Sequence, residues 1–184
     1  MYQQACQKMY SAIIVLLVLC VLFGTAIAQK KDNAAAHLQP QHRAVVERWL
    51  VERTKFRLAI DGDYVDKSFV AAERESFENY HPYYLVADFN GDKKDDFALA
   101  LVDTQKRTKK FAIVVFNGPV GDESVPALFR EGFDLRRMAF TAAEGIEVEG
   151  RTSLFVENPN TGKGWVLRRS RKGYVLMPSQ NDFN

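Results

Sequence analysis

The sequence predicts an α+β fold, in which two N-terminal helices pack on an antiparallel β-meander. Apolar residues recur at helical spacing until His81-Pro82, and from Tyr83 onward the pattern becomes strand-like. Short turns rich in Gly, Asn and Pro then separate the apolar runs, and sequential strands joined by short turns favour antiparallel pairing. Helices that precede such a sheet can cover one of its faces.

Residues 1–28 have the features of a secretory signal peptide. Lys8 supplies a positive charge, Ile13 to Phe23 is an unbroken apolar run, and Ala26-Ile27-Ala28 has the small-x-small cleavage pattern. The apolar run is shorter than the roughly 20 residues that span a membrane. We therefore expect cleavage after Ala28, no membrane attachment afterwards, and a periplasmic or extracellular protein. An uncleaved anchor is the alternative.

Cleavage at this position would leave 156 of the 184 residues, enough for one domain with a sizeable core. Residues 29–39 are expected to be a flexible lead-in and residues 40–184 a single α+β domain. Both cysteines, Cys6 and Cys20, lie in the leader, so the exported chain would lack disulfides, a composition that favours a bacterial source. It would carry 24 basic and 23 acidic residues, a balance that gives no indication of nucleic-acid binding.

Two helices are expected before the sheet. Pro40 suits the first turn of the first helix, and apolar residues then repeat at helical spacing from His42 to about Lys55. Ser68 is expected to cap the second helix, which ends at His81-Pro82 because the residue before proline disfavours helical geometry. One face of this second helix would carry Phe69, Ala72, Ser76, Phe77 and Tyr80.

The rest of the chain reads as a series of strands. Phe111 to Phe116 is apolar on both faces, as in a central strand, whereas Gly145 to Gly150 alternates between apolar and polar residues. Three further strands are expected at Ser153 to Glu157, Trp165 to Arg169 and Tyr174 to Met177.

The stretch that says most about function is Tyr83 to Asp103, in which two apolar runs of strand length flank an acidic loop. Oxygen-bearing side chains stand at relative positions one, three, five and nine of this loop, namely Asp88, Asn90, Asp92 and Asp96. A tight loop can turn such side chains inward, and the backbone carbonyl of Lys94 can add another oxygen. Calcium takes about 6–8 oxygen ligands in flexible geometry, so the spacing predicts a calcium site in the first β-hairpin.

The loop resembles the Asp-rich calcium loops of the FG-GAP and VCBS repeat families, which lie between two strands. The residues that match the family pattern are Asp88, Asn90, Gly91, Asp92 and Asp96. The likeness covers about 20 of 184 residues and occurs once, so no propeller of repeated blades is expected. An EF-hand is disfavoured, because Leu99 stands where its bidentate Glu is required. The resemblance implies a non-catalytic calcium-binding module.

Lys93 is the one departure from the family pattern, which usually has glycine there. If the loop closes like its relatives, this position has a positive φ, which costs a lysine on the order of 1 kcal/mol. We therefore expect weak calcium affinity. The alternative is a plain hairpin turn, since Asp, Asn and Gly favour turns in any case. The protein would then be a metal-independent structural or inhibitor-like protein of the cell envelope.

Catalytic chemistry has less support in the sequence. His81 precedes the acidic loop and is a possible general base, but neither a cysteine of the mature chain nor a serine in a nucleophile-elbow context accompanies it. We therefore expect no enzymatic activity and disfavour a His/Asp hydrolase. His37 and His42 are expected to be solvated, as is the acidic cluster Asp61, Asp63 and Asp66.

Basic residues collect at several expected turns, including Lys109-Lys110 and Arg168-Arg169. Two such turns on one edge would suit an anionic envelope polymer, whereas separate turns are ordinary solvated cations that discourage edge-to-edge pairing. The partner is expected to be an unidentified protein or an envelope polymer.

Overall fold

The computed structural model describes residues 35–143, 152–171 and 173–179. The expected signal peptide and the strand expected from Gly145 to Gly150 lie outside the described residues. The chain divides into residues 1–36 and 37–184, and the elements below belong to the second unit. Among the described residues, no helix combines the length and apolarity needed to cross a membrane.

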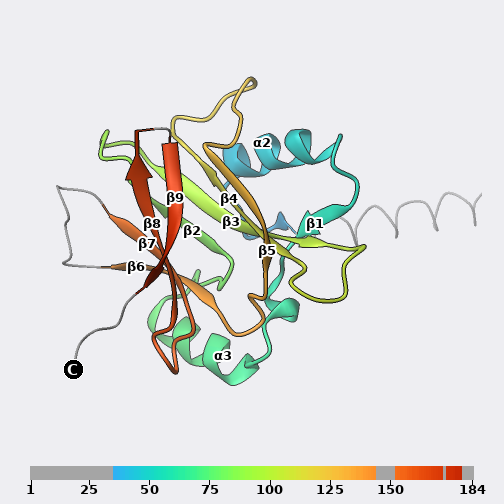
Figure 1. Ribbon diagram of the computed structural model, residues 1–184, viewed down its shortest axis with the longest axis vertical. Helices are drawn as coiled ribbons and strands as arrows, with labels where there is room; N and C mark the ends of the chain where they lie inside the picture. Colours follow the sequence, from blue (N-terminus) through green and yellow to red (C-terminus); the bar gives the residue numbers. More distant parts are fainter. Residues whose placement is uncertain (1–34, 144–151, 172, 180–184) are drawn as a thin grey trace, which may run out of the picture. The chain divides into compact units, whose positions relative to one another are not determined.

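The described residues form two α-helices, a short 3₁₀-helix and nine β-strands (Figure 1). In chain order the elements are α2 (Pro40–Leu50), β1 (Phe56–Leu58), η2 (Asp61–Asp63), α3 (Lys67–Ser76), β2 (Tyr84–Ala87), β3 (Asp96–Asp103), β4 (Phe111–Phe116), β5 (Leu128–Phe133), β6 (Ala139–Ala143), β7 (Ser153–Glu157), β8 (Gly164–Ser170) and β9 (Gly173–Ser179).

The predicted fold class, two helices packed on one meander, is wrong. The fold is mainly β, and its strands form two antiparallel sheets. The first has the strand order β1-β3-β4-β5, with β2 also paired to β3, and the second has the order β6-β7-β8-β9. Turn residues mark where one strand ends and the next begins, but they do not mark where the chain changes sheet. That change occurs between Phe133 and Ala139.

The two sheets share one hydrophobic core, to which β3 and β4 contribute every second residue. Its members from the first sheet include Ala98, Ala100, Val102, Phe111, Ile113 and Val115. Its members from the second sheet include Ala139, Phe140, Leu154, Val156, Leu167 and Leu176. The period-two alternation of a strand places these side chains on the faces that meet.

The other face of the first sheet lies against α2, so β3 and β4 are buried on both faces, as predicted for Phe111 to Phe116. His42 stacks on Phe97 with the ring centroids 4.0 Å apart, and Trp49 contacts Phe116 edge-on. The prediction of a solvated His42 is wrong, since only 5% of it is exposed and its Nδ1 lies 2.7 Å from Tyr84 Oη. His42 shares the buried face of α2 with Val45, Val46 and Trp49 at helical spacing.

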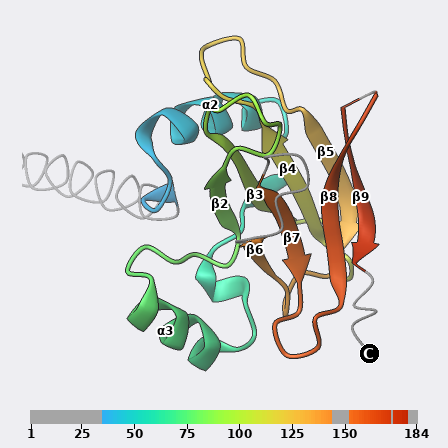
Figure 2. The same ribbon diagram turned by 90° about the vertical axis from the view of Figure 1, so that its left-hand side faces the viewer.

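The second helix, α3, lies at one end of the two sheets instead of on a face (Figure 2). Its N-cap is Asp66, which accepts a hydrogen bond from the Phe69 N–H at 3.0 Å, so the predicted cap at Ser68 is wrong. Phe69 packs against the shared core, but Phe77 lies beyond the end of the helix and is 62% exposed. The predicted apolar face of this helix is therefore only partly buried.

Asp61 is part of a polar cluster and is not the freely solvated turn residue that was predicted. It forms an ion pair with Arg74, and its Oδ1 lies 3.2 Å from His81 Nδ1. Burial raises the pKa of the Asp61 carboxyl. Hydrogen bonds from His81 and Arg74 outweigh this effect and lower the pKa to about 2. The ring of His37 lies 4.4 Å from that of His81, and burial together with this neighbour lowers the pKa of His37 to about 4.

Acidification from pH 7 to pH 4.5 should destabilise the fold through His37 and His42. Burial lowers the pKa of both histidines, so below pH 6.5 the unfolded chain binds protons that the folded chain resists. Their contribution to stability is fully present above the unfolded pKa and is lost as the pH falls toward the folded value. Urea unfolding at several pH values should show that the free energy of unfolding falls as the pH falls. In a His37→Gln/His42→Gln double variant, the free energy of unfolding should depend less steeply on pH. If the free energy of unfolding of the double variant depends on pH as steeply as that of the parent, the role given to the two histidines is wrong.

Candidate functional site at the acidic loop

The acidic loop, residues 88–95, joins two paired strands as predicted. Ala87 of β2 lies opposite Asp96 of β3 where the hairpin closes. Gly91 and Lys93 both have positive φ, at 80° and 65°. The positive φ expected for Lys93 is therefore confirmed, and this lysine holds a backbone conformation that costs most residues roughly 1–2 kcal/mol.

Side-chain oxygens fix the shape of the loop by accepting hydrogen bonds from its backbone. Asp88 Oδ1 accepts from the Gly91 N–H at 2.6 Å, and Asp88 Oδ2 accepts from the Lys93 N–H at 2.8 Å. Asn90 Oδ1 accepts from the Asp92 N–H at 2.7 Å. Short polar side chains that bond to nearby backbone groups in this way are what favour Asp and Asn in turns.

Asp96 joins the loop to two other parts of the fold and has 0% of its surface exposed. Its Oδ2 accepts from the N–H groups of Phe89 and Asn90 at 2.9 and 3.1 Å. Its Oδ1 accepts from the Gly118 N–H at 2.8 Å, in the β4–β5 connection, and from Asn90 Nδ2 at 3.2 Å. The Tyr174 hydroxyl of β9 lies 3.4 Å from Oδ2. One carboxylate thus connects the loop, the first sheet and the second sheet.

The surroundings of Asp96 also determine which groups carry protons. Burial raises the pKa of the Asp96 carboxyl, while hydrogen bonds from Gly118, Phe89 and Asn90 act in the opposite direction. Burial and the Asp96 charge raise the pKa of Tyr174, so its hydroxyl keeps its proton at neutral pH and acts as a donor. Tyr174 Oη also lies 2.9 Å from Asn117 Oδ1.

The arrangement of the predicted ligands only partly suits a calcium ion. A carboxylate has about four lone-pair positions, and the protein donors around Asp96 occupy them. Within the described ranges, no group of three or more Asp, Glu, His or Cys side chains is placed to hold a metal. Asp88, Asn90, Asp92 and the carbonyl of Lys94 are the oxygens that remain for an ion. Their role as ligands stays a prediction.

A polar cavity of about 360 Å³ lies beside the loop. Asn90 and Asp92 form part of one wall, and the β8–β9 hairpin contributes Arg169, Arg171 and Tyr174. Figure 1 shows the loop and this hairpin at the same end of the fold. Arg169 donates to the Asn90 carbonyl at 3.0 Å, which ties the two walls together. Loop oxygens and guanidinium groups therefore line one cavity, which suits a ligand that offers both donors and anionic groups.

Sequence reasoning found the loop but missed the residues that complete its surroundings. Asn117, Gly118, Arg169 and Tyr174 reach the loop through strand pairing and through the packing of the two sheets. Arg169 belongs to a basic turn noted in the sequence, yet nothing in the spacing connects that turn to the loop. His81, a possible general base by its position before the loop, has Asp61 and Arg74 as its hydrogen-bond partners and not the loop carboxylates.

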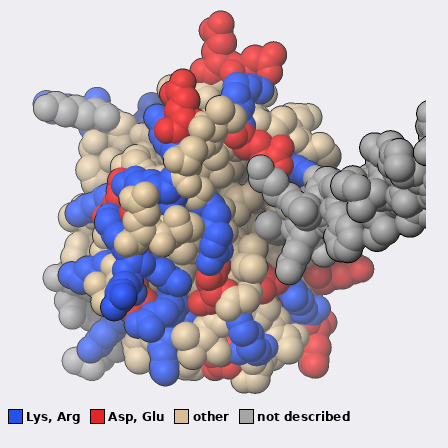
Figure 3. All heavy atoms as spheres, turned by 90° about the vertical axis from the view of Figure 1, so that its right-hand side faces the viewer, with Lys and Arg blue, Asp and Glu red and all other residues tan. Residues whose placement is uncertain are grey.

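Lys and Arg side chains also gather on one side of the face shown in Figure 3. Several of the fold's cations are held by carboxylates of neighbouring strands. Lys55 Nζ and Lys106 Nζ lie 3.1 and 2.8 Å from Glu131, and both are within 3.5 Å of Asp103. Lys55 directly precedes β1 and Lys106 lies in the β3–β4 turn, so the two lysines tie these segments to β3 and β5 and make a weaker candidate for ligand binding than the cavity.

Asp96→Asn should destabilise the protein although it barely changes side-chain size. The new amide nitrogen replaces one acceptor oxygen and faces backbone donors, at a cost of about 2–3 kcal/mol. For a chain of this size the melting temperature should fall by roughly 5–10 °C. Asp95→Asn is the matched control, because Asp95 is the exposed neighbour and its replacement should leave the melt nearly unchanged. Equal melting temperatures for the two variants would contradict the role given to Asp96.

Comparison of the chain with protein-family models, with curated proteins and with solved structures finds no match in any of the three.

Proposed function

We propose that this protein is an exported, non-catalytic binding module for a protein or polymer of the cell envelope. Its binding site is the polar cavity between the acidic loop and the β8–β9 hairpin. The observation that carries the proposal is the way Asp96 and the loop hydrogen bonds hold one wall of that cavity in a fixed shape. A preformed wall lowers the cost of ordering the site when a ligand binds.

Further support comes from the chemistry of the cavity. Its polar side chains are amides, guanidinium groups, hydroxyls and a carboxylate, which recognise polar ligands by hydrogen bonding. A nucleophile held by a general base is the usual mark of covalent catalysis, and the residues described around this cavity do not include such a pair. Export is proposed from the features of residues 1–28 alone.

A second candidate is a calcium-dependent module, and the backbone of the loop favours it. Positive φ at Lys93 matches the closure expected of the calcium loops that the sequence resembles. Asp88, Asn90, Asp92 and the Lys94 carbonyl would hold the ion, which would supply positive charge to neutralise the two carboxylates. The strain at Lys93 weakens binding, so we expect a Kd of roughly 10⁻⁴–10⁻³ M, the range of extracellular modules.

Cosedimentation of the purified protein with bacterial cell envelopes tests both candidates. The first predicts binding in millimolar calcium and in chelator alike, and a loss of about tenfold in Arg171→Glu, because the charge in the cavity is reversed. Arg107→Glu makes the same change on the exposed β3–β4 turn and should bind like the parent.

Three other outcomes are informative. Binding that requires calcium, with a melting temperature that rises by several degrees in calcium, would favour the second candidate over the first. Binding lost equally in both arginine variants would show that it depends on net charge alone and would overturn the cavity as the site. No binding in either buffer would overturn the proposed function.

A further inference from the structure

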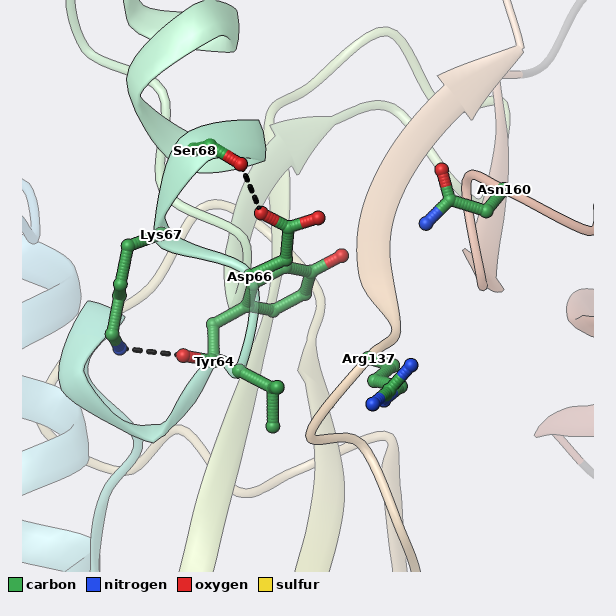
Figure 4. Close-up of a pocket in the computed structure, with 7 residues that line it drawn as sticks. Tyr64, Asp66, Lys67, Ser68, Arg137 and Asn160 are labelled. Atoms are coloured by element: carbon green, nitrogen blue, oxygen red, sulfur yellow. Dashed lines mark hydrogen bonds between the residues drawn. The ribbon is translucent and has the colours of Figure 1, made fainter.

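Two neighbouring hollows lie at the end of the fold opposite the acidic loop. The first, of about 400 Å³, lies between residues 64–68, Arg137 and Asn160 (Figure 4). The second, of about 550 Å³, extends toward Asn158 and Lys163. Both are lined by Val65 and Arg137, so the two hollows adjoin, and together they are called here the Arg137 groove.

Three segments build the Arg137 groove; backbone hydrogen bonds join two of them and close the turn that forms the third. The Val65 N–H, before α3, donates to the Arg136 carbonyl of the β5–β6 connection at 2.8 Å. In the β7–β8 turn, the Asn158 N–H donates to the Lys163 carbonyl at 3.0 Å, and the Thr161 N–H donates to the Asn158 carbonyl at 3.1 Å. The groove is therefore preformed, and it offers a ligand mainly side chains.

Both carboxylates of the groove are already engaged. Asp134 is held by two hydrogen bonds from the Arg136 guanidinium, at 2.6 and 2.8 Å. Asp66 caps α3, and its Oδ1 accepts from Ser68 Oγ and from the Phe69 N–H. Neither carboxylate is bonded to the remaining cations of the groove, which are Lys67, Arg137 and Lys163.

Two of these cations are available to a ligand. Lys67 Nζ is used within the fold, where it donates to the carbonyls of Asp61 and Tyr64. Arg137 and Lys163 are both exposed. Hydrogen bonds from Ser68 and Phe69 lower the pKa of Asp66, and the nearby charge of Arg137 adds to this effect, so Arg137 already has one carboxylate in its neighbourhood. Figure 4 shows Arg137 and Asn160 across the hollow from Tyr64 and Asp66. The groove is lined by Lys67, Arg136, Arg137 and Lys163 against Asp66 and Asp134, so it has an excess of positive charge beside amide and hydroxyl groups.

We propose that the Arg137 groove binds an acidic oligosaccharide. A carboxylate of the sugar pairs with Arg137 and Lys163, and hydroxyl groups of the chain bond to Asn158, Asn160 and Thr161. An acidic peptide fits less well, because Val65 is the groove's one strongly exposed apolar side chain among the described residues. This site is separate from the cavity at the acidic loop, so each can fail without the other.

Calorimetric titration of the full chain with hexagalacturonate tests the proposal. Arg137→Gln should weaken binding at least tenfold, since it removes a charge-assisted pair, and Lys163→Gln should weaken it about threefold. Arg107→Gln removes the same charge from the β3–β4 turn and should stay within twofold of the parent. All three residues are exposed, so the variants should fold.

Two further ligands separate the sugar from its charge. The proposal predicts no binding of neutral maltohexaose and at least tenfold weaker binding of hexaglutamate than of hexagalacturonate. Equal affinity for hexaglutamate would show a site for charge alone and overturn the assignment to a saccharide. If hexagalacturonate does not bind, or if Arg107→Gln weakens its binding as much as Arg137→Gln does, the Arg137 groove is not the binding site.

Discussion

The buried carboxylate of Asp96 is the interaction on which the functional end of this protein depends. It accepts hydrogen bonds from the start of the acidic loop, from Gly118 in the β4–β5 connection and from Tyr174 in the second sheet. A buried charge is costly unless it is hydrogen-bonded, and here backbone N–H groups supply most of the compensation. Replacing the carboxylate by an amide removes the charge and one of the two acceptor oxygens, so the contacts of all three segments with this side chain would weaken.

The same kind of hydrogen bond reduces the repulsion among the carboxylates of the acidic loop. Carboxylates that lie close together repel, and a bound metal is one way to neutralise them. Here, the backbone N–H groups of Gly91 and Lys93 point at Asp88, and those of Phe89 and Asn90 point at Asp96. The dipoles of these groups offset part of the repulsion.

The sequence predicts local features of this protein better than their assembly. The hairpin around the loop, the positive φ of Lys93 and the doubly buried strand Phe111–Phe116 follow from spacing and turn chemistry, which act over a few residues. The division into two sheets does not, because turn residues look alike within a sheet and between sheets. For the same reason no pattern pairs Asp96 with Tyr174, which lies 78 residues away.

Amide hydrogen exchange measured by NMR tests the central claim most directly. The account predicts that the amides of Phe89, Asn90 and Gly118 exchange slowly in the parent, and that all three exchange at least tenfold faster in Asp96→Asn. Amides in the centre of β4, such as that of Val114, should change much less. Fast exchange of the three amides in the parent, or unchanged protection in Asp96→Asn, would contradict the role of Asp96 as the link between loop and sheets.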